Sequence, residues 1–513
     1  MSTQQFDLAS DSLQAPDPSQ TTYIKLVGFQ KWQRLRSQIS LYYFWEKRWF
    51  FISMLVGYIF LEMPTPDGLT REGQIVLAMS LMATIMFVTE PIPLPTVALL
   101  IIAGQVILLG LESTEVAKSL MTDSVLFIMG SLMLAVAVVK QKLDKRIAWF
   151  IVRMTGTKTV WIAFGISSVS GIMASFVGEH TVAAMMLPVG VTLITLTSDD
   201  PKKVKNLAAV LLFSIAYGCS IASIGTPSGG ARNAIMVGYW KEFFFDPNSP
   251  ETAKYLIDYA KWMAYAYPMF LLQLPLVTLI LLSAFKPEYR DLSRACTRLR
   301  TQILLEGPLK AKDWVAIVIF LIVLYGWIFL SADLGMGIIA IMGAAAFLIA
   351  GLVLWDDVNS GVNWGVVLLY AAAISLGVQM KNTGAAGWIA ENFVALLKPI
   401  GADSGIGLWA AVSILTTSVT NTMSNGAAVA VLGPIVLDLA KVSGESPIII
   451  GFITAVSSAF AYLTVVGTPA CTIVYASGYL KTTDFLKVGW RMVLMSTTVL
   501  LLVSFFYWPM LSS

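Results

Sequence analysis

The chain has 513 residues, of which 57% are hydrophobic and 13% are charged, and its formal net charge is +3. Soluble domains carry about 25% charged residues, so this composition excludes an ordinary soluble protein. The small net charge and the scattering of basic residues through the loops give no support for a nucleic-acid partner.

The N-terminal segment, residues 1–48, is polar at first and then mixes basic with aromatic residues. It has no apolar core of the kind that a signal peptide needs. We expect it to lie at the cytoplasmic face of the membrane and to contain an interfacial helix. For residues 1–20 the alternative is a partly ordered tail.

Apolar runs of about 20 residues, the length that crosses a bilayer, recur through the rest of the chain. They predict an all-α polytopic membrane protein with about 11 transmembrane spans, since the ten-residue alternation of outer-membrane barrels is absent. Uninterrupted spans are expected near 49–63, 72–90, 94–112, 124–140, 262–285, 313–331, 335–355, 364–381 and 488–508. Two more spans, 206–238 and 448–478, are interrupted by polar residues and are expected to be broken helices.

Two other apolar stretches, 160–196 and 404–442, are too long for one span, and each has a polar break in its middle. A helix, a polar tip and a second helix that returns to the same side explain this pattern. We therefore expect two re-entrant helical hairpins.

The loops at 140–158 and 286–312 are the two longest clusters of Lys and Arg after residue 48, and together they hold nearly half of the basic residues there. Positive loops stay in the cytoplasm, which agrees with a cytoplasmic N-terminus. The loop at 286–312 is the expected linker between a first half, 49–285, and a second half, 313–513. The lack of a targeting signal fits a multi-pass protein of a bacterial inner (plasma) membrane.

The two halves repeat one another. Gly225-Thr226-Pro227 has a counterpart in Gly467-Thr468-Pro469, and Pro188 has one in Pro434, all at offsets of about 240 to 246 residues. An odd number of spans before the linker would place the halves in opposite orientations. Inverted repeats with broken helices are typical of secondary transporters, whose binding sites lie near the membrane midplane.

Four polar breaks can converge in such a fold: Ser175–Thr181, Ser223–Asn233, Thr420–Gly426 and Gly467–Thr472. Non-helical backbone at membrane depth survives only inside protein or along a wet cavity. Helix N-termini at the breaks favour an anion, and exposed carbonyl oxygens suit a hard cation such as Na⁺. The breaks therefore predict a small anionic substrate, with a cation beside it.

Three segments resemble a known family. "SNGAAVAVLGPI" (424–435) is similar to the hairpin motif of the divalent anion/sodium symporter (DASS) family, and residues 220–235 and 465–478 are similar to its two unwound helices. The resemblance covers nearly all of 49–510. It implies a homodimer in which a scaffold domain holds the interface and a transport domain moves like an elevator.

The resemblance also implies site residues. The substrate would contact two motifs, Glu179-His180-Thr181 and Ser424-Asn425-Gly426, together with Thr468 and Pro469. One sodium site would use Ser175, the tip at 179–180 and Gly225. The other would use Thr420, Met423, Asn425 and Gly467. Na⁺ is then the candidate coupling ion, and no other cofactor is expected.

This sequence departs from the family pattern at the first motif, where Glu179-His180 replaces Ser-Asn, and at Arg232 and Gly426. One hypothesis is that Glu179-His180, with Arg232 across the gap, replaces the first sodium site. Arg232 is always charged, and His180 adds a switchable charge, because unperturbed histidine titrates near neutral pH. In a second hypothesis, Glu179 and Arg232 simply neutralise each other. In a third, Glu179 is itself a sodium ligand, since carboxylate oxygens suit hard cations.

The sequence thus favours a secondary active transporter of small multivalent anions, with di- and tricarboxylates first and sulfate or another oxyanion second. The alternative from another class is an anion-binding membrane sensor or scaffold. An enzyme is not expected: the chain has one histidine, no H-E-x-x-H motif and no arrangement for a catalytic triad. Three dispersed cysteines, Cys219, Cys296 and Cys471, give no metal site or disulfide framework.

Overall fold

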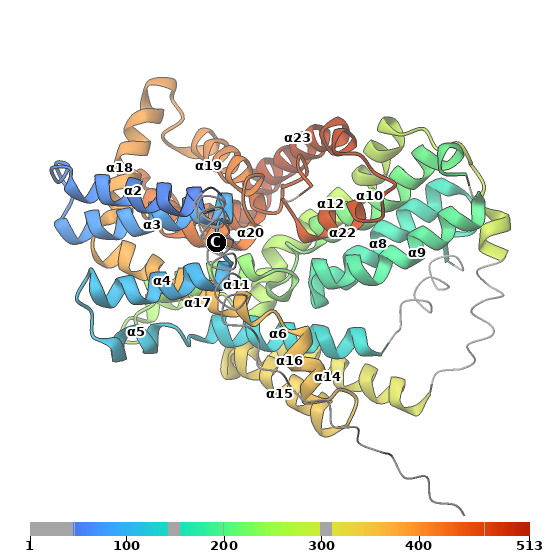
Figure 1. The fold of residues 1–513 in the computed structure, drawn as a ribbon, viewed down its shortest axis with the longest axis horizontal. Helices are drawn as coiled ribbons and strands as arrows, with labels where there is room; N and C mark the ends of the chain where they lie inside the picture. The colour runs from blue at the N-terminus through green and yellow to red at the C-terminus, as the bar shows by residue number, and fades with distance from the viewer. Residues whose placement is uncertain are drawn as a thin grey trace, which may run out of the picture.

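The computed structural model describes residues 45, 47–141, 154–198, 200–297, 310–465 and 467–512. These residues form helices joined mostly by short loops, without a strand (Figure 1). Ten of the described helices are long and apolar enough to cross a membrane, or up to 11 if one bent pair counts as a single span. The predicted all-α polytopic class is confirmed. Nearly all of the predicted interfacial helix within 1–48 lies outside the described residues.

The helices of the first half precede the linker. They are α2 (Arg48–Glu62), α3 (Arg71–Thr89), α4 (Leu94–Ile107), α5 (Ser113–Ser119), α6 (Asp123–Lys140), α8 (Thr159–Val177), α9 (Glu179–Thr197), α10 (Lys205–Ala222), α11 (Ala231–Phe244) and α12 (Tyr259–Ala284). Short 3₁₀ turns cover Pro201–Val204, Pro227–Gly229 and Pro250–Tyr255.

The second half follows the linker. Its helices are α14 (Ala311–Leu334), α15 (Met336–Ile349), α16 (Trp355–Gly361), α17 (Trp364–Asn382), α18 (Ala385–Leu397), α19 (Gly405–Thr420), α20 (Asn425–Ser443), α21 (Pro447–Ser457), α22 (Pro469–Tyr475), α23 (Thr482–Phe506) and α24 (Trp508–Ser512), with a 3₁₀ turn at Lys398–Ile400.

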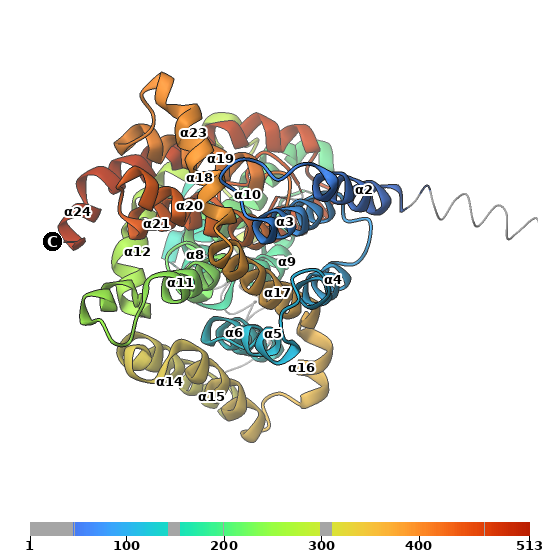
Figure 2. The same cartoon turned by 90° about the vertical axis from the view of Figure 1, so that its left-hand side faces the viewer.

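The order of elements repeats between the halves. The run α3–α4–α5–α6 has the same order of long and short helices as α14–α15–α16–α17, and the pairs α8/α9 and α10/α11 correspond to α19/α20 and α21/α22. The runs also exchange partners: α4 packs on α17, and α15 packs on α6. In Figure 2, α14 and α15 lie at the lower edge, outside α6. The opposite membrane orientation of the halves stays a prediction.

Two predicted spans, 94–112 and 335–355, are shorter than expected. Each begins as a helix, α4 or α15, and then turns at a glycine with positive φ, Gly110 (φ 70°) or Gly351 (φ 63°). Glycine adopts this conformation without the steric penalty of a side chain. A short helix follows each turn, α5 or α16, and neither was predicted from the sequence.

The breaks differ in length from the prediction. The tip of the hairpin α8/α9 is Gly178 alone, with φ 94°, whereas the tip of α19/α20 is the segment 421–424. The break between α21, which ends at Ser457, and α22, which begins at Pro469, starts upstream of the predicted Gly467–Thr472. The Thr468 hydroxyl accepts the backbone N–H of Cys471 and so caps α22. A helix therefore starts where the break was expected to continue.

Helix α10 lies in the interior, and nearly all of its residues are buried. Beyond its break, α11 is held by Tyr239, which is fully buried. The Tyr239 hydroxyl donates to the carbonyl of Ala430 on α20 at 2.8 Å. Gly377 on α17 and Gly433 on α20 leave room for its ring. The two halves thus interlock around the broken helices.

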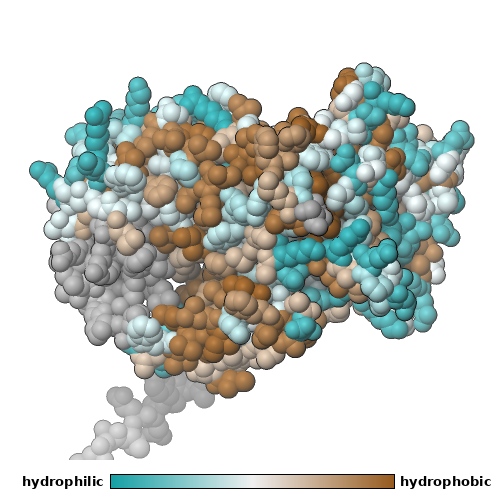
Figure 3. All heavy atoms as spheres, turned by 180° about the vertical axis from the view of Figure 1, so that it is seen from behind, coloured by the Kyte–Doolittle hydropathy of each residue, from teal (hydrophilic) through white to brown (hydrophobic). Residues whose placement is uncertain are grey.

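The outer surface carries an apolar band. In Figure 3 this band covers the middle of the face, and hydrophilic residues gather toward its two ends. Helix α14 contributes exposed apolar side chains, among them Leu321, Ile322 and Phe329. Such an exposed apolar surface suits contact with lipid.

Gly335, between α14 and α15, should not tolerate a side chain. Its φ is 82°, and an added Cβ would lie 2.9 Å from Oδ1 of Asp123. Gly335→Ala should therefore lower the free energy of unfolding by about 2–3 kcal/mol. Gly351→Ala is the matched control, because its φ is 63° but no atom lies within 4 Å of an added Cβ. Thermal-unfolding midpoints in detergent would compare them, and equal shifts would contradict this reading of the α14–α15 turn.

Candidate functional site

The tip of the hairpin α8/α9 places an acidic side chain inside the protein. Gly178 turns the chain, and Glu179 begins α9 with only 6% of its surface exposed. Arg232, in the first turn of α11, is 2% exposed. Burying either charge alone would be costly, so buried charges are expected to have partners.

Glu179 has partners from both halves of the chain. Its Oε1 lies 3.7 Å from Nη1 of Arg232 and accepts a hydrogen bond from Nδ2 of Asn425 at 3.2 Å. Its Oε2 accepts from the Ser223 hydroxyl at 3.3 Å, and the same hydroxyl accepts from Nη2 of Arg232. The two hairpin tips and the break after α10 are therefore joined at one carboxylate.

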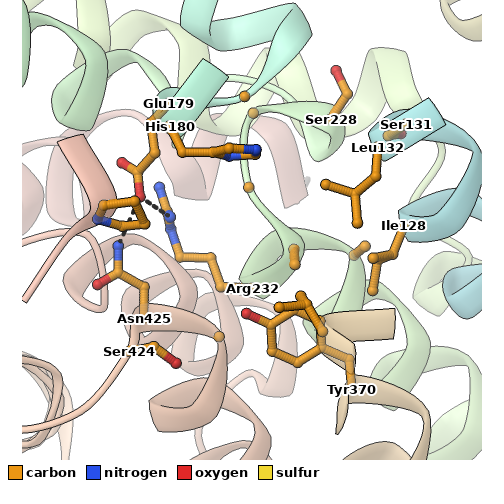
Figure 4. Close-up of a pocket in the computed structure, with 18 of the residues that line it drawn as sticks. Ile128, Ser131, Leu132, Glu179, His180, Ser228, Arg232, Tyr370, Ser424 and Asn425 are labelled. Carbon is orange, nitrogen blue, oxygen red and sulfur yellow. Dashed lines mark hydrogen bonds and ion pairs between the residues drawn. The ribbon is translucent and has the colours of Figure 1, made fainter. Parts of the chain in front are cut away.

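His180 points in another direction. Its side chain is exposed, and Nε2 lies 3.2 Å from the Thr181 hydroxyl. Figure 4 shows its ring turned away from the Arg232 side and toward Ser131, Leu132 and Ser228. The two adjacent ionisable residues therefore do different things: Glu179 is engaged within the protein, whereas His180 faces open space.

That space is a cavity of about 350 Å³. One side is apolar and comes mainly from α6, with Phe127, Ile128 and Leu132. The other side holds the hairpin tips and the start of α11. The predicted site residues that line it are Glu179, His180, Arg232, Ser424, Asn425, Gly426 and Pro469. The sequence-distant motifs thus border one cavity.

Two predicted substrate residues are not among those that line the cavity. Thr181 is 6% exposed and lies in the first turn of α9. Thr468 is fully buried, and its hydroxyl caps α22. Their contact with substrate stays a prediction.

The oxygens near the first predicted sodium site are hydrogen-bonded to protein donors. The Ser175 hydroxyl donates to the carbonyl of Ala222 at 3.0 Å, and the backbone N–H of Gly225 donates to the same carbonyl at 2.9 Å. The Thr226 hydroxyl donates to the carbonyl of Ser175. These bonds satisfy carbonyl groups that a helix break would otherwise leave free.

Asn233 closes the rest of this break. Its Nδ2 donates to the carbonyls of Ser223 at 2.8 Å and Thr226 at 2.7 Å. The guanidinium of Arg232 donates a hydrogen bond to the Ser223 hydroxyl oxygen. A fixed positive charge is therefore next to the oxygens of the break.

The second predicted sodium site has only neutral groups. The Thr420 hydroxyl lies 2.7 Å from the carbonyl oxygen of Ser458 and 2.9 Å from Oδ1 of Asn425. Met423 is buried at the same hairpin tip. Gly467 lies in the break before α22, where neighbouring atoms leave little room for a side chain. Hydroxyl, amide and carbonyl oxygens of this kind suit a hard cation.

Tyr370 was not predicted from the sequence. It comes from α17, lines the cavity, and places its hydroxyl where a side chain of Gly426 would begin. Figure 4 shows its ring opposite the hairpin-tip residues. One signal could have pointed to it: Gly426 stands where the family motif has threonine.

The fold and the family match together define the class of protein as a membrane transporter. Residues 45–513 match the family described as the sodium:sulfate symporter transmembrane region, and the chain belongs to this family. The resemblance to the divalent anion/sodium symporter family is thereby confirmed.

Relatives are transporters and not enzymes. A sodium-dependent dicarboxylate transporter from Staphylococcus saprophyticus is 26% identical over 497 residues, which cover 90% of this chain and 93% of the relative. A sodium-dependent high-affinity dicarboxylate transporter from Caenorhabditis elegans is 26% identical over 451 residues, covering 79% of this chain and 77% of the relative.

Among solved structures, the YdaH transporter of Alcanivorax borkumensis is similar, with a TM-score of 0.53. The similarity covers 75% of this chain and 85% of that one at 16% sequence identity. At this identity, the likeness concerns the fold alone.

Gly426→Ala should destabilise the hairpin tip, because the added Cβ would overlap the Tyr370 hydroxyl and lie 2.5 Å from its Cζ. We expect a loss of about 1–3 kcal/mol in the free energy of unfolding. Most of that loss should vanish when Gly426→Ala is made in a Tyr370→Leu background. Gly387→Ala on α18 is the control, since no atom lies within 4 Å of its added Cβ. Unfolding midpoints in detergent would show whether the two substitutions are coupled, and strict additivity would contradict the contact.

Proposed function

We propose that this chain is a secondary active transporter that moves small carboxylate anions across a membrane. The sequence favours di- and tricarboxylates, and relatives named as dicarboxylate transporters support the carboxylate class. The observation that carries the proposal is the meeting of both hairpin tips and the α10–α11 break around one cavity that contains a buried arginine.

The surroundings of the cavity support an anion. Three helices, α9, α11 and α20, begin at residues that line it. The free N–H groups and positive dipole end of a helix N-terminus favour negative charge. Arg232 is permanently charged but is paired with Glu179, and His180 adds a positive charge when protonated. Sulfate or another oxyanion is the second candidate by the same reasoning.

We propose further that the first sodium site is replaced by protein groups. The oxygens there already have protein donors, and the Arg232 guanidinium lies beside them. Glu179 is already paired with Arg232, so these residues leave no unpaired negative charge for a sodium ion and fit one poorly. The neutral oxygens around Thr420 and Asn425 fit Na⁺ better, and relatives are named as sodium-dependent. Coupling to Na⁺ is thus proposed at that second site.

The remaining parts of the proposal follow from the family. The chain would be a homodimer of the inner membrane with a cytoplasmic N-terminus, and hairpins α8/α9 and α19/α20 would be re-entrant. They would move with the broken helices as one elevator-type transport domain against the scaffold formed by helices such as α4, α6, α15 and α17. An anion-binding sensor or scaffold is the alternative, and it would bind the anion without moving it.

Counterflow in proteoliposomes separates these alternatives. Vesicles loaded with unlabelled anion should take up the labelled form, tested with succinate, citrate, butyrate and sulfate in turn. Asn425→Ala and Thr468→Ala should each reduce the uptake while the protein remains folded. Binding of an anion without counterflow of any of the four would favour the sensor. Full uptake in both variants would contradict the site assignment.

The sodium proposal predicts a shallow dependence of uptake on external Na⁺. Uptake should be measured from zero Na⁺ upward at about pH 5.5 and about pH 7.5, in the wild type and in His180→Asn, because unperturbed histidine titrates within this range. The wild type should change with pH, and His180→Asn should not. A steep, cooperative Na⁺ requirement that survives His180→Asn, with no pH effect in either protein, would show that the residues do not substitute for sodium.

A further inference from the structure

We infer that Glu179 occupies the place of one substrate carboxylate, so that the cavity takes an anion with a single carboxylate and an uncharged, apolar body. This inference rests on the proposed function and narrows its substrate class. Three observations carry it: the partners of Glu179, the charges that line the cavity and the apolar side of the cavity.

The first observation is that the donors at the junction of the two hairpin tips are already engaged. Asn425 Nδ2 donates to Glu179 at 3.2 Å and Arg232 lies 3.7 Å away. The Ser223 hydroxyl lies 3.3 Å from the carboxylate and shares its proton with the Ser220 carbonyl at 2.8 Å. An amide, a hydroxyl and a guanidinium around one carboxylate form the kind of set that recognises a carboxylate ligand. Here the carboxylate belongs to the protein.

The second observation is the charge balance. Among the described residues that line the cavity, the only acidic or basic side chains of the Asp, Glu, His, Lys and Arg types are those of Glu179, His180 and Arg232. Glu179 offsets Arg232, so the fixed side-chain charges sum to zero, and only His180 and the helix N-termini are left to offset a ligand. A dianion would bring at least one charge into the cavity without a partner, which is costly away from water.

The third observation is the open half of the cavity. His180 faces it, and the Ser131 hydroxyl at its edge has no hydrogen-bond partner among the described residues. Around Ser131, α6 presents Phe127, Ile128 and Leu132. Polar groups of His180 and Ser131 beside the apolar side chains of α6 match a ligand with one anionic group and an apolar body.

Binding to the purified, detergent-solubilised protein tests this inference with butyrate and succinate, which share four carbons and differ by one carboxylate. Isothermal titration calorimetry should find that the wild type binds butyrate more tightly than succinate by about tenfold. Glu179→Gln keeps the shape of the side chain and frees the charge of Arg232, so this order should reverse. Asp438→Asn is the matched control, because Asp438 pairs with Lys441 at 2.8 Å and does not line the cavity. The control should keep the wild-type order.

Each result decides the matter. Tighter binding of succinate by the wild type overturns the inference, even if Glu179→Gln does not fold. An unchanged order in folded Glu179→Gln overturns the role given to Glu179, and so does the absence of binding by either anion. Counterflow of dicarboxylates combined with tight succinate binding would leave the proposed transport function standing while this inference fails. Tight butyrate binding without counterflow of any anion would do the reverse.

Discussion

The buried ion pair between Glu179 and Arg232 is the constraint on which the site depends. The two side chains are 6% and 2% exposed, so neither charge is stabilised by water. A buried pair is strongly destabilised when one member is lost, and here its hydrogen bonds also reach Ser223 and Asn425. The pair therefore holds together one hairpin tip from each half and the break of a helix.

Packing by small residues makes this meeting possible. Gly377 and Gly433 leave room for Tyr239, which fastens α11 to α20, and Gly426 leaves room for Tyr370 at the cavity. Because the interior is densely packed, adding a single methyl group at such positions would force neighbouring atoms to shift. The positions of Glu179, Arg232 and Asn425 thus depend on these close contacts of the two tyrosines with glycines on neighbouring helices.

Family membership suggests sodium-coupled dicarboxylate transport, whereas the departures from the family pattern suggest a different coupling ion and substrate. Residues 45–513 match the family, and relatives at 26% identity are named as sodium-dependent dicarboxylate transporters. Arg232 and Glu179, however, place both a cation and a carboxylate inside the protein. In this chain a guanidinium and a carboxylate that belong to the protein stand where a bound cation and one substrate carboxylate would lie. This is the physical basis for proposing a different coupling ion and a narrower substrate class.

The sequence by itself determined the all-helical membrane class, the two apolar stretches with polar tips and the repeat, because hydropathy and spacing are local properties. The family resemblance and the departures from it also pointed to Glu179, His180, Arg232 and Asn425, which the structure brings to one cavity. Only the tertiary structure decided that Glu179 turns inward while His180 faces the cavity, and that Tyr370 fills the space beside Gly426. These outcomes depend on which helices pack together, and neighbouring residues at a helix start point in different directions.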